Sequence, residues 1–495
     1  MKLPSRTSLA SWAYSAAILG VLYVVAFVLL GAAMLPGGAG FCLLLVYVLA
    51  SLCGDVVKAL SPRLPPLLGM LLAGLVLRNV PTVLDATAPV LGHGFDWWSS
   101  QARAGALAVI MLRAGLGLDL QKLRKLGLLT ARLAFGPCLA EALTVALLAA
   151  PLLELPPAWG GTLGFVIAAV SPAVVVPGML DLQERGYGVA RGVPTMVVAA
   201  ASFDDVLAIA GFGVCLALAV ASEGGDDGGG GGNDGGALAW LILKAPVELL
   251  AGVAAGLVGG AAVSAPHECV CGAGVGAPPP GRRFVAALGA AALCVFGGKA
   301  LNFSGGGALG AVVLGAAAAR GWGDEARAPV RAAVNAAWAR AQPALFGLLG
   351  AAVDLHAIVP SLLWRGALVL AGSLVVRICV TRVAVACSPL TYREARLVCV
   401  AWLPKATVQA AVGGVALDVM RERGLGAEAE ARGALVLMLS VLVILATAPV
   451  GAIGIAAAGP RWLEREVPKV VGEAVSTTEA PVDEEEEAAA PNASV

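Results

Sequence analysis

Long apolar segments dominate this sequence and limit what the chain can fold into. Of its 495 residues, 59% are hydrophobic and 13% are charged, whereas soluble domains carry roughly 25% charged residues. A helix needs about 20 mostly apolar residues to cross a bilayer. The pattern predicts an all-α polytopic membrane protein with about 14 transmembrane helices, at residues 12–34, 39–58, 65–80, 102–118, 127–153, 158–180, 192–221, 236–264, 284–301, 305–320, 333–353, 358–384, 393–418 and 433–458.

Basic residues gather at alternate connections between these segments and predict an orientation, because cytoplasmic connections are enriched in Lys and Arg. With the N-terminus in the cytosol, the cytoplasmic connections include Lys122, Lys125 and Arg132, and the opposite ones are nearly free of basic residues apart from 419–432. The run 12–34 is too long for the apolar part of a signal peptide, so it is interpreted as the first span. We expect both termini in the cytosol, with a short segment at 1–11, a membrane domain at 12–460 and a disordered acidic tail at 461–495.

Charge and cysteine usage exclude several classes of function. Lys and Arg together number 33, as do Asp and Glu, and basic residues do not cluster with aromatic ones, so no nucleic-acid partner is expected. Most of the ten cysteines lie in apolar segments, which is typical of small apolar side chains rather than a disulfide framework. His267, Cys269 and Cys271 lack the usual zinc spacing. No nucleophile–base pattern or cofactor motif is present, so we expect neither an enzyme nor a resident cofactor.

Two adjacent aspartates, Asp204 and Asp205, lie deep within an apolar segment. A charge near the bilayer centre costs at least ~2.5–3.5 kcal/mol and usually marks a functional site. Carboxylate oxygens are ligands for hard cations such as Na⁺. Because the two carboxylates repel each other, a proton or a bound cation is needed to relieve that repulsion. The pair therefore predicts a site at which protons and cations compete.

Three further ionisable residues lie within apolar segments: Glu141, Arg377 and Lys405. Glu141 and Arg377 have opposite charges and are expected to pair across helices, either as a structural strut or as part of transport. Lys405 either neutralises an aspartate when no cation is bound or pairs with another carboxylate. Three acids and two bases sum to a net charge of −1 when all are ionised. One monovalent cation or one proton brings the sum to zero, which predicts one-for-one exchange.

Two segments contain signals for interrupted helices. Pro172 removes a backbone donor and disfavours helix at Ser171. The second signal is the Gly-rich run 302–307, which includes Ser304 and Gly305. Interrupted helices at corresponding positions of two halves point to an ion site between inverted repeats. We therefore expect the cation to lie where these two interruptions meet.

The sequences around these residues resemble a known family. Residues 170–177 read Val-Ser-Pro-Ala-Val-Val-Val-Pro, residues 202–205 read Ser-Phe-Asp-Asp, and residues 401–410 read Ala-Trp-Leu-Pro-Lys-Ala-Thr-Val-Gln-Ala. In this order, over roughly residues 60–460, they closely resemble the NHA subgroup of sodium/proton antiporters, relatives of bacterial NhaA.

The resemblance implies an NhaA-like fold with inverted repeats, two crossed broken helices, a dimerisation domain and a moving core, working as a homodimer by elevator-type alternating access. It also implies that Na⁺ or Li⁺ and H⁺ bind at Asp204 and Asp205, with Asp205 the principal ligand. Backbone carbonyls near Val170 and Ala201 match positions that complete the coordination. Ala201 stands where the family pattern predicts a glycine.

Other functions are also compatible with these residues. A K⁺/H⁺ antiporter of the same fold would use the same acidic pair, because oxygen ligands bind both cations. A pH sensor or scaffold that does not transport would keep its function after Asp205→Asn. A channel is disfavoured because the sequence contains no repeated filter segment. The sequence does not distinguish the plasma membrane from endosomal or mitochondrial membranes.

Overall fold

Helices form nearly all of the computed structural model, which describes residues 20–21, 23–35, 38–61, 64–79, 93–117, 120–223, 235–265, 278–301, 304–355, 360–386 and 388–465. In these ranges the only extended pairing is an isolated bridge between Tyr187 and Arg465. The elements are η1 (Gly31–Met34), α2 (Ala39–Leu60), α3 (Leu67–Asn79), α5 (His93–Gly117), α6 (Leu120–Leu153), α7 (Pro157–Ala168), α8 (Pro172–Glu184), α9 (Val193–Glu223), α10 (Gly235–Ser264), α12 (Pro280–Ala300), α13 (Ser304–Ala351), α14 (Pro360–Ala384), α15 (Tyr392–Ala401), α16 (Thr407–Val412), α17 (Val415–Arg423) and α18 (Ala427–Trp462).

Seven described stretches are long and apolar enough to cross a membrane, judged by length and composition. They are Ala39–Leu60, Gly127–Leu153, Pro157–Glu184, Val193–Glu223, Pro280–Ala300, Pro360–Ala384 and Ala427–Trp462. Each coincides with a predicted span, and shorter apolar helices lie at Tyr23–Met34, Leu67–Asn79 and Leu250–Ser264. The chain is therefore an integral membrane protein with several spans, while the count of fourteen stays a prediction.

Two long helices each contain a sharp turn at a glycine. Gly127 in α6 has φ 71° and ψ −163°, and Gly323 in α13 has φ 70° and ψ 177°. A residue with a side chain rarely adopts such a positive φ, so glycine permits the chain to turn there. Gly127 is also where the predicted span 127–153 begins. Gly323 separates the predicted spans 305–320 and 333–353, which the structure joins in one element.

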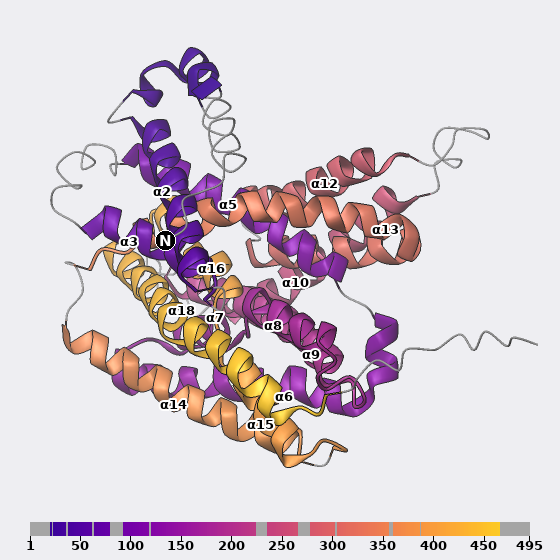
Figure 1. Ribbon diagram of the computed structural model, residues 1–495. Coiled ribbons are helices and arrows are strands. Elements are labelled where there is room, and N and C mark those ends of the chain that lie inside the picture. Colours follow the sequence, from indigo (N-terminus) through magenta and orange to yellow (C-terminus); the bar gives the residue numbers. More distant parts are fainter. Residues whose placement is uncertain are drawn as a thin grey trace, which may run out of the picture.

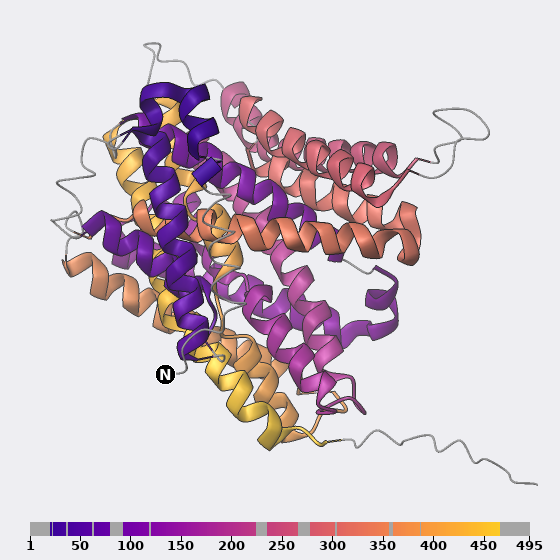
Figure 2. The same ribbon diagram turned by 45° about the horizontal axis from the view of Figure 1, so that its top comes forward.

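The helices form two bundles that lie side by side (Figures 1 and 2). In the first, which we call the scaffold bundle, α13 packs against α3, α5, α10 and α12. In the second, the core bundle, α6 packs against α7, α9 and α14, and α18 packs against α8, α15 and α17. Contacts of α9 with α10 and α13, and of α16 with α5, join the two bundles.

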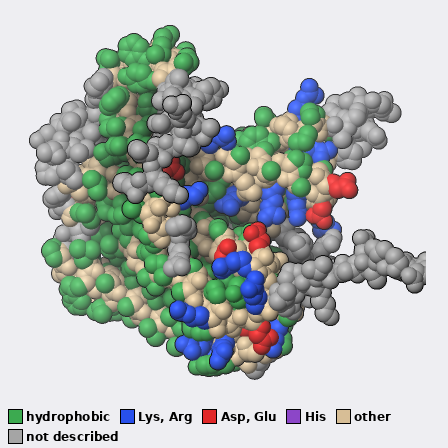
Figure 3. Space-filling view, in the orientation of Figure 1, with side chains coloured by type: hydrophobic (Ala, Val, Ile, Leu, Met, Phe, Trp, Pro, Cys, Tyr) green, Lys and Arg blue, Asp and Glu red, His purple; other side chains and the backbone are tan. Residues whose placement is uncertain are grey.

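One face of the core bundle carries exposed apolar side chains. Phe135, Leu139, Leu143 and Leu147 repeat every four residues along α6 and are all exposed. Positions four apart lie on one face of a helix, so these residues form a stripe suited to lipid contact. Figure 3 shows hydrophobic side chains spread over the left and the top of the view, while Lys and Arg lie across its middle, on its right and in its lower part. Such a distribution is typical of a protein with its sides in lipid and its ends in water.

Two helix interruptions meet inside the core bundle. Residues 169–171 separate α7 from α8, and residues 402–406 separate α15 from α16. Proline is placed at both: Pro172 begins α8, and Pro404 lies within the second interruption. The backbone N–H of Ser171 donates to the carbonyl oxygen of Pro404 at 2.8 Å, so the two non-helical segments touch.

The prediction of the second interruption at Ser304 and Gly305 was wrong in its position. These two residues form the first turn of α13, and 302–303 lie outside the described residues. The glycines of this run allow α13 to approach α12 closely, because a Cβ added at Gly307 would lie 2.5 Å from the carbonyl oxygen of Cys294. The Gly-rich run therefore indicates close packing of helices, whereas Pro404 was the residue that indicated the second interruption.

Candidate functional site

The two interruptions leave backbone carbonyls that long side chains satisfy. Ala168 ends α7, and its carbonyl oxygen accepts hydrogen bonds from Arg377 and, at 3.1 Å, from Lys405 Nζ. The carbonyl of Trp402, at the end of α15, accepts from Arg377 Nε at 2.7 Å. A carbonyl without a partner at membrane depth is costly. The two basic side chains therefore stabilise the non-helical segments by donating to their backbone carbonyls, in addition to carrying charge.

Glu141, Arg377 and Lys405 form a single ion-paired group with no exposed surface. Arg377 Nη1 lies 2.6 Å and Lys405 Nζ lies 2.5 Å from the same carboxylate oxygen, Glu141 Oε2. The predicted pairing of Glu141 with Arg377 is present, and Lys405 shares it. Because each member has an oppositely charged neighbour, the group avoids the full cost of an isolated buried charge.

Asp204, on α9, is held by groups from both neighbouring elements. Its Oδ2 accepts a hydrogen bond of 2.6 Å from the backbone N–H of Val170, in the first interruption. Arg377 Nη2 lies 3.4 Å from Oδ1 and 3.5 Å from Oδ2 of Asp204. The side chain has no exposed surface. Asp204 is therefore fixed at the meeting point of α9, α14 and the first interruption.

Asp205, the next residue, differs from Asp204 in its surroundings. It is 5% exposed, and its Oδ1 is buried without a hydrogen-bond partner among the described residues. Asp205 has no direct ion pair in the described structure, and the charges that act on it are those of Asp204, Arg377, Lys405 and, least, Arg113 on α5. Arg113 Nε itself donates to Asn335 Oδ1 at 2.9 Å. A buried carboxylate oxygen without a partner is costly. Asp205 therefore has an oxygen available to a proton or a cation.

The five charged residues singled out in the sequence thus lie in one buried region. Glu141, Asp204 and Asp205 supply three negative charges, and Arg377 and Lys405 supply two positive ones, so the fully ionised set carries −1. The four paired members are Glu141, Asp204, Arg377 and Lys405. Asp205 is the one member of this set without a direct ion pair in the described structure, so the net charge of −1 is assigned to it, with Arg113 outside the set and beyond ion-pair distance.

Two backbone positions named in the sequence also lie in this region. Val170 presents its N–H to Asp204, whereas the family pattern emphasises the carbonyls near it. Ala201 is fully buried on α9, one turn before Asp205. Ser171 Oγ lies 3.5 Å from Thr407 Oγ1, across the two interruptions. Of these groups, the backbone N–H of Val170 is the one that contacts an aspartate directly.

Gln409 is a polar residue of the site that the sequence argument missed. Its Nε2 lies 2.9 Å from the carbonyl oxygens of Val166 and Ala169 and 3.3 Å from that of Ile167. The Oε1 of the same side chain is buried without a partner among the described residues. The available signal was its position, four residues after Lys405 in an otherwise apolar stretch.

No group of three or more His, Cys, Asp and Glu side chains is placed to hold a metal in the described part of the chain. His267, Cys269 and Cys271 lie outside that part. The site is therefore described by its aspartate pair and the ion-paired group beside it.

Comparison with known proteins places this geometry in a wider context. Residues 43–458 match the family model of the transmembrane sodium/hydrogen exchangers. The chain is 40% identical over 457 residues to sodium/hydrogen exchanger 9B2 of Pongo abelii, covering 90% of this chain and 80% of that protein. It is 37% identical over 452 residues to human sodium/hydrogen exchanger 9B1, covering 90% and 83%. The fold is similar to that of the sodium proton antiporter MjNhaP1 of Methanocaldococcus jannaschii, with TM-score 0.63, 19% identity, and coverage of 86% of this chain and 98% of that one.

Proposed function

The chain belongs to the sodium/hydrogen exchanger family, and from this membership we propose that it exchanges Na⁺ or Li⁺ for H⁺ across a membrane. The observation that carries the proposal is that the Asp205 carboxylate is buried and has an oxygen without a hydrogen-bond partner among the described residues. This carboxylate lies beside a group whose other charges are paired. A single positive charge completes this arrangement.

Protons and cations compete for the same place in this proposal. A hard cation prefers carboxylate, carbonyl and hydroxyl oxygens. Asp205 supplies the principal ligand, Asp204 the second carboxylate, and the carbonyls near Val170 and Ala201 complete the set. When a proton binds instead, it neutralises the same uncompensated charge, so each species displaces the other.

The paired residues have distinct roles in this proposal. Arg377 orients Asp204 and supports the carbonyls of Ala168 and Trp402. Lys405 contacts Glu141 at 2.5 Å, which favours its pairing with that carboxylate over direct neutralisation of an aspartate. Glu141 is therefore the shared counterion of two basic side chains. The ion-paired group holds the helices together and also sets the net charge around Asp205.

The division into bundles supports a proposal of alternating access. The aspartates, both interruptions and the ion-paired group belong to the core bundle, while α5 and α13 of the scaffold bundle pack beside them. We infer that the core bundle slides against the scaffold bundle in an elevator-type cycle. NhaA-like inverted repeats, about 14 spans, a homodimer and cytosolic termini complete the proposed architecture.

Proton flux in proteoliposomes tests the function. Dissipation of a pH gradient would be measured after adding Na⁺, Li⁺ or K⁺, for the wild type and for Asp205→Asn. We expect Na⁺- and Li⁺-dependent flux that Asp205→Asn abolishes. Asp181→Asn is the matched control, because Asp181 is an exposed aspartate at the end of α8 that pairs with Arg185. Flux that survives Asp205→Asn would contradict the assigned site, and flux with K⁺ alone would contradict the assigned cation.

The charge count is tested by repeating the assay with the membrane potential clamped. A potential of about 100 mV is worth ~2.3 kcal/mol per charge moved. One-for-one exchange moves no net charge, so the rate should be indifferent to the potential. A rate that changes several-fold with voltage would show that the net charge of the site does not determine the stoichiometry.

A further inference from the structure

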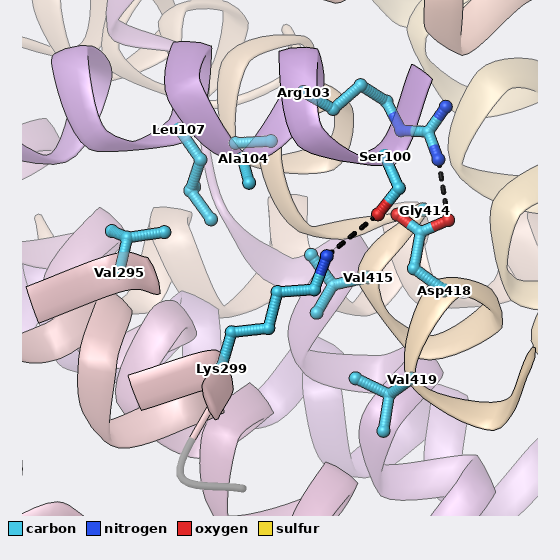
Figure 4. A pocket seen from close by; sticks show the side chains of 11 residues that line it. Ser100, Arg103, Ala104, Leu107, Val295, Lys299, Gly414, Val415, Asp418 and Val419 are labelled. Carbon is cyan, nitrogen blue, oxygen red and sulfur yellow. Dashed lines mark hydrogen bonds and ion pairs between the residues drawn. The ribbon is translucent and has the colours of Figure 1, made fainter. Parts of the chain in front are cut away.

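A second cluster of charged side chains lies between the two bundles, away from the aspartates. It surrounds a small cavity of about 40 Å³, lined by residues of α5, α12, α16 and α17 (Figure 4). Arg103 and Ser100 on α5 and Lys299 on α12 approach it from the scaffold bundle, and Asp418 on α17 approaches it from the core bundle. The proposed exchange reaction does not use any of these residues.

Two ion pairs cross the boundary at this cavity. Arg103 Nη2 lies 2.6 Å from Asp418 Oδ1, and Lys299 Nζ lies 2.6 Å from Glu422 Oε1. The Arg103 and Asp418 side chains are only 10% and 12% exposed. Ser100 belongs to the second pair, because its Oγ accepts from Lys299 at 2.9 Å and donates to Glu422 Oε1 at 3.4 Å.

The basic members belong to one bundle and the acidic members to the other. Other ion pairs near helix ends join the core bundle to itself, such as Arg191–Glu394, Arg365–Glu154 and Arg432–Glu223. The pairs at the cavity instead connect α5 and α12 with α17. They therefore resist any displacement of the core bundle along the scaffold bundle.

The acidic members are mechanically connected to the cation site. α16 begins directly after the interruption that contains Lys405, and α17 follows it to Asp418 and Glu422. Arg103 lies against the backbone between these two helices, because a Cβ added at Gly414 would be 3.4 Å from Arg103 Nε. A shift of the interruption that carries Lys405 is thus transmitted through a short helical path to both acids.

We propose that Arg103–Asp418 and Lys299–Glu422 form an interbundle latch that closes the boundary at the end where α17 joins α18. This latch must part before that end opens to water, and under the predicted topology it is the end away from the cytosol. The function assigned to the latch rests on the proposed exchange cycle, but the experiment that tests the latch does not depend on that cycle. Partly buried ion pairs suit such a device, because desolvation offsets much of their attraction and they can be exchanged for hydrated charges.

Labelling of a cysteine placed behind the latch tests the proposal without measuring transport. Ala411 lines the cavity and is 4% exposed. Ala411→Cys would be labelled in proteoliposomes with a membrane-impermeant maleimide, against the same protein without the added cysteine. Ala427→Cys, at the exposed start of α18, reports the fraction of molecules that present this end to the reagent. We expect slow labelling at 411 and fast labelling at 427.

Removing the acids should open the boundary. In Asp418→Asn combined with Glu422→Gln, we expect the labelling rate of Ala411→Cys to rise about tenfold, equivalent to ~1.4 kcal/mol. Glu430→Gln is the matched control, because Glu430 pairs with Arg421 at the same end but within the core bundle. It should leave the rate unchanged. Exchanging the charges of one pair, with Arg103→Asp and Asp418→Arg together and Glu422 unchanged, should keep the labelling of Ala411→Cys slow.

Two results would overturn the latch. One is an unchanged labelling rate at 411 after loss of both acids, and the other is an equal increase with Glu430→Gln. Loss of cation exchange has no bearing on either result, since labelling requires only that the boundary opens. Conversely, an intact latch in a protein without exchange activity would refute the proposed function alone.

Discussion

At the scale of single residues, the two neighbouring aspartates differ in what holds them. Asp204 has a backbone donor and Arg377, while Asp205 has a buried oxygen without a partner in the described structure. Glu141 also has a buried oxygen without a partner, Oε1, but two basic groups contact its Oε2, whereas Asp205 has no direct ion pair in the described structure. Removal of these carboxylates should therefore have opposite effects on stability.

Substituting Glu141 by Gln should destabilise the protein, whereas Asp205→Asn should not. Glu141→Gln leaves Arg377 and Lys405 without their shared counterion, and breaking a buried pair in this way costs about 3–5 kcal/mol. Asp205→Asn removes a buried carboxylate that makes no direct ion pair in the described structure, so the folded state is expected to become as stable or more stable. Thermal unfolding in detergent at low Na⁺ compares the two. Equal losses of stability would mean that Asp205 is as well paired as Glu141.

At the scale of elements, the ends of α7 and α15 depend on side chains from other helices. Gln409 Nε2 of α16 lies within hydrogen-bond distance of three carbonyls at and just beyond the end of α7, and Arg377 of α14 donates to carbonyls at the ends of both α7 and α15. An interrupted helix at membrane depth needs such partners for its open carbonyls. The interruption is therefore a property of several helices together, not of Pro172 alone.

Gln409→Leu should loosen the end of α7. The three carbonyls would lose their donor, and a buried polar group left without a partner costs about 1–3 kcal/mol. Gln183→Leu is the control, since Gln183 is exposed on α8 and surface substitutions usually change stability by less than ~0.5 kcal/mol. Unfolding in detergent measures both. A loss no larger than that of Gln183→Leu would show that water replaces the amide at these carbonyls.

The sequence predicted the charged members of the site better than it predicted the backbone around them. A charge in an apolar span is costly and therefore visible in the sequence, so Glu141, Asp204, Asp205, Arg377 and Lys405 could all be identified. The second interruption was misplaced because a Gly-rich run was preferred to Pro404, although glycine serves close helix packing equally well. Contacts such as those of Gln409 depend on which helices meet, and a single sequence carries no direct signal for that.

At the scale of the whole molecule, a short helical segment connects the buried site with the boundary between the bundles. α16 and α17 connect the interruption at Lys405 with the latch at Asp418 and Glu422. In the proposed cycle, the charge of the site decides when the core bundle can move, because a charge without a counterion is costly to carry past apolar surface. The latch adds a second condition at one end. Together, the charge of the site and the latch would allow the core bundle to move when the site is neutral and would prevent ions from leaking across the membrane.

Cation binding should stabilise the whole fold, and protons should weaken that effect. A ligand that binds only the folded state stabilises it by RT ln(1 + [L]/Kd), about 2.7 kcal/mol when the ligand is at 100 times its Kd. Na⁺ should therefore raise the unfolding temperature at high pH. The increase should shrink as the pH falls, because protons occupy the same carboxylates. Choline chloride at equal ionic strength is the control, and Asp205→Asn should abolish the increase. A Na⁺ effect that persists in Asp205→Asn, or that grows at low pH, would place the cation away from the aspartate pair.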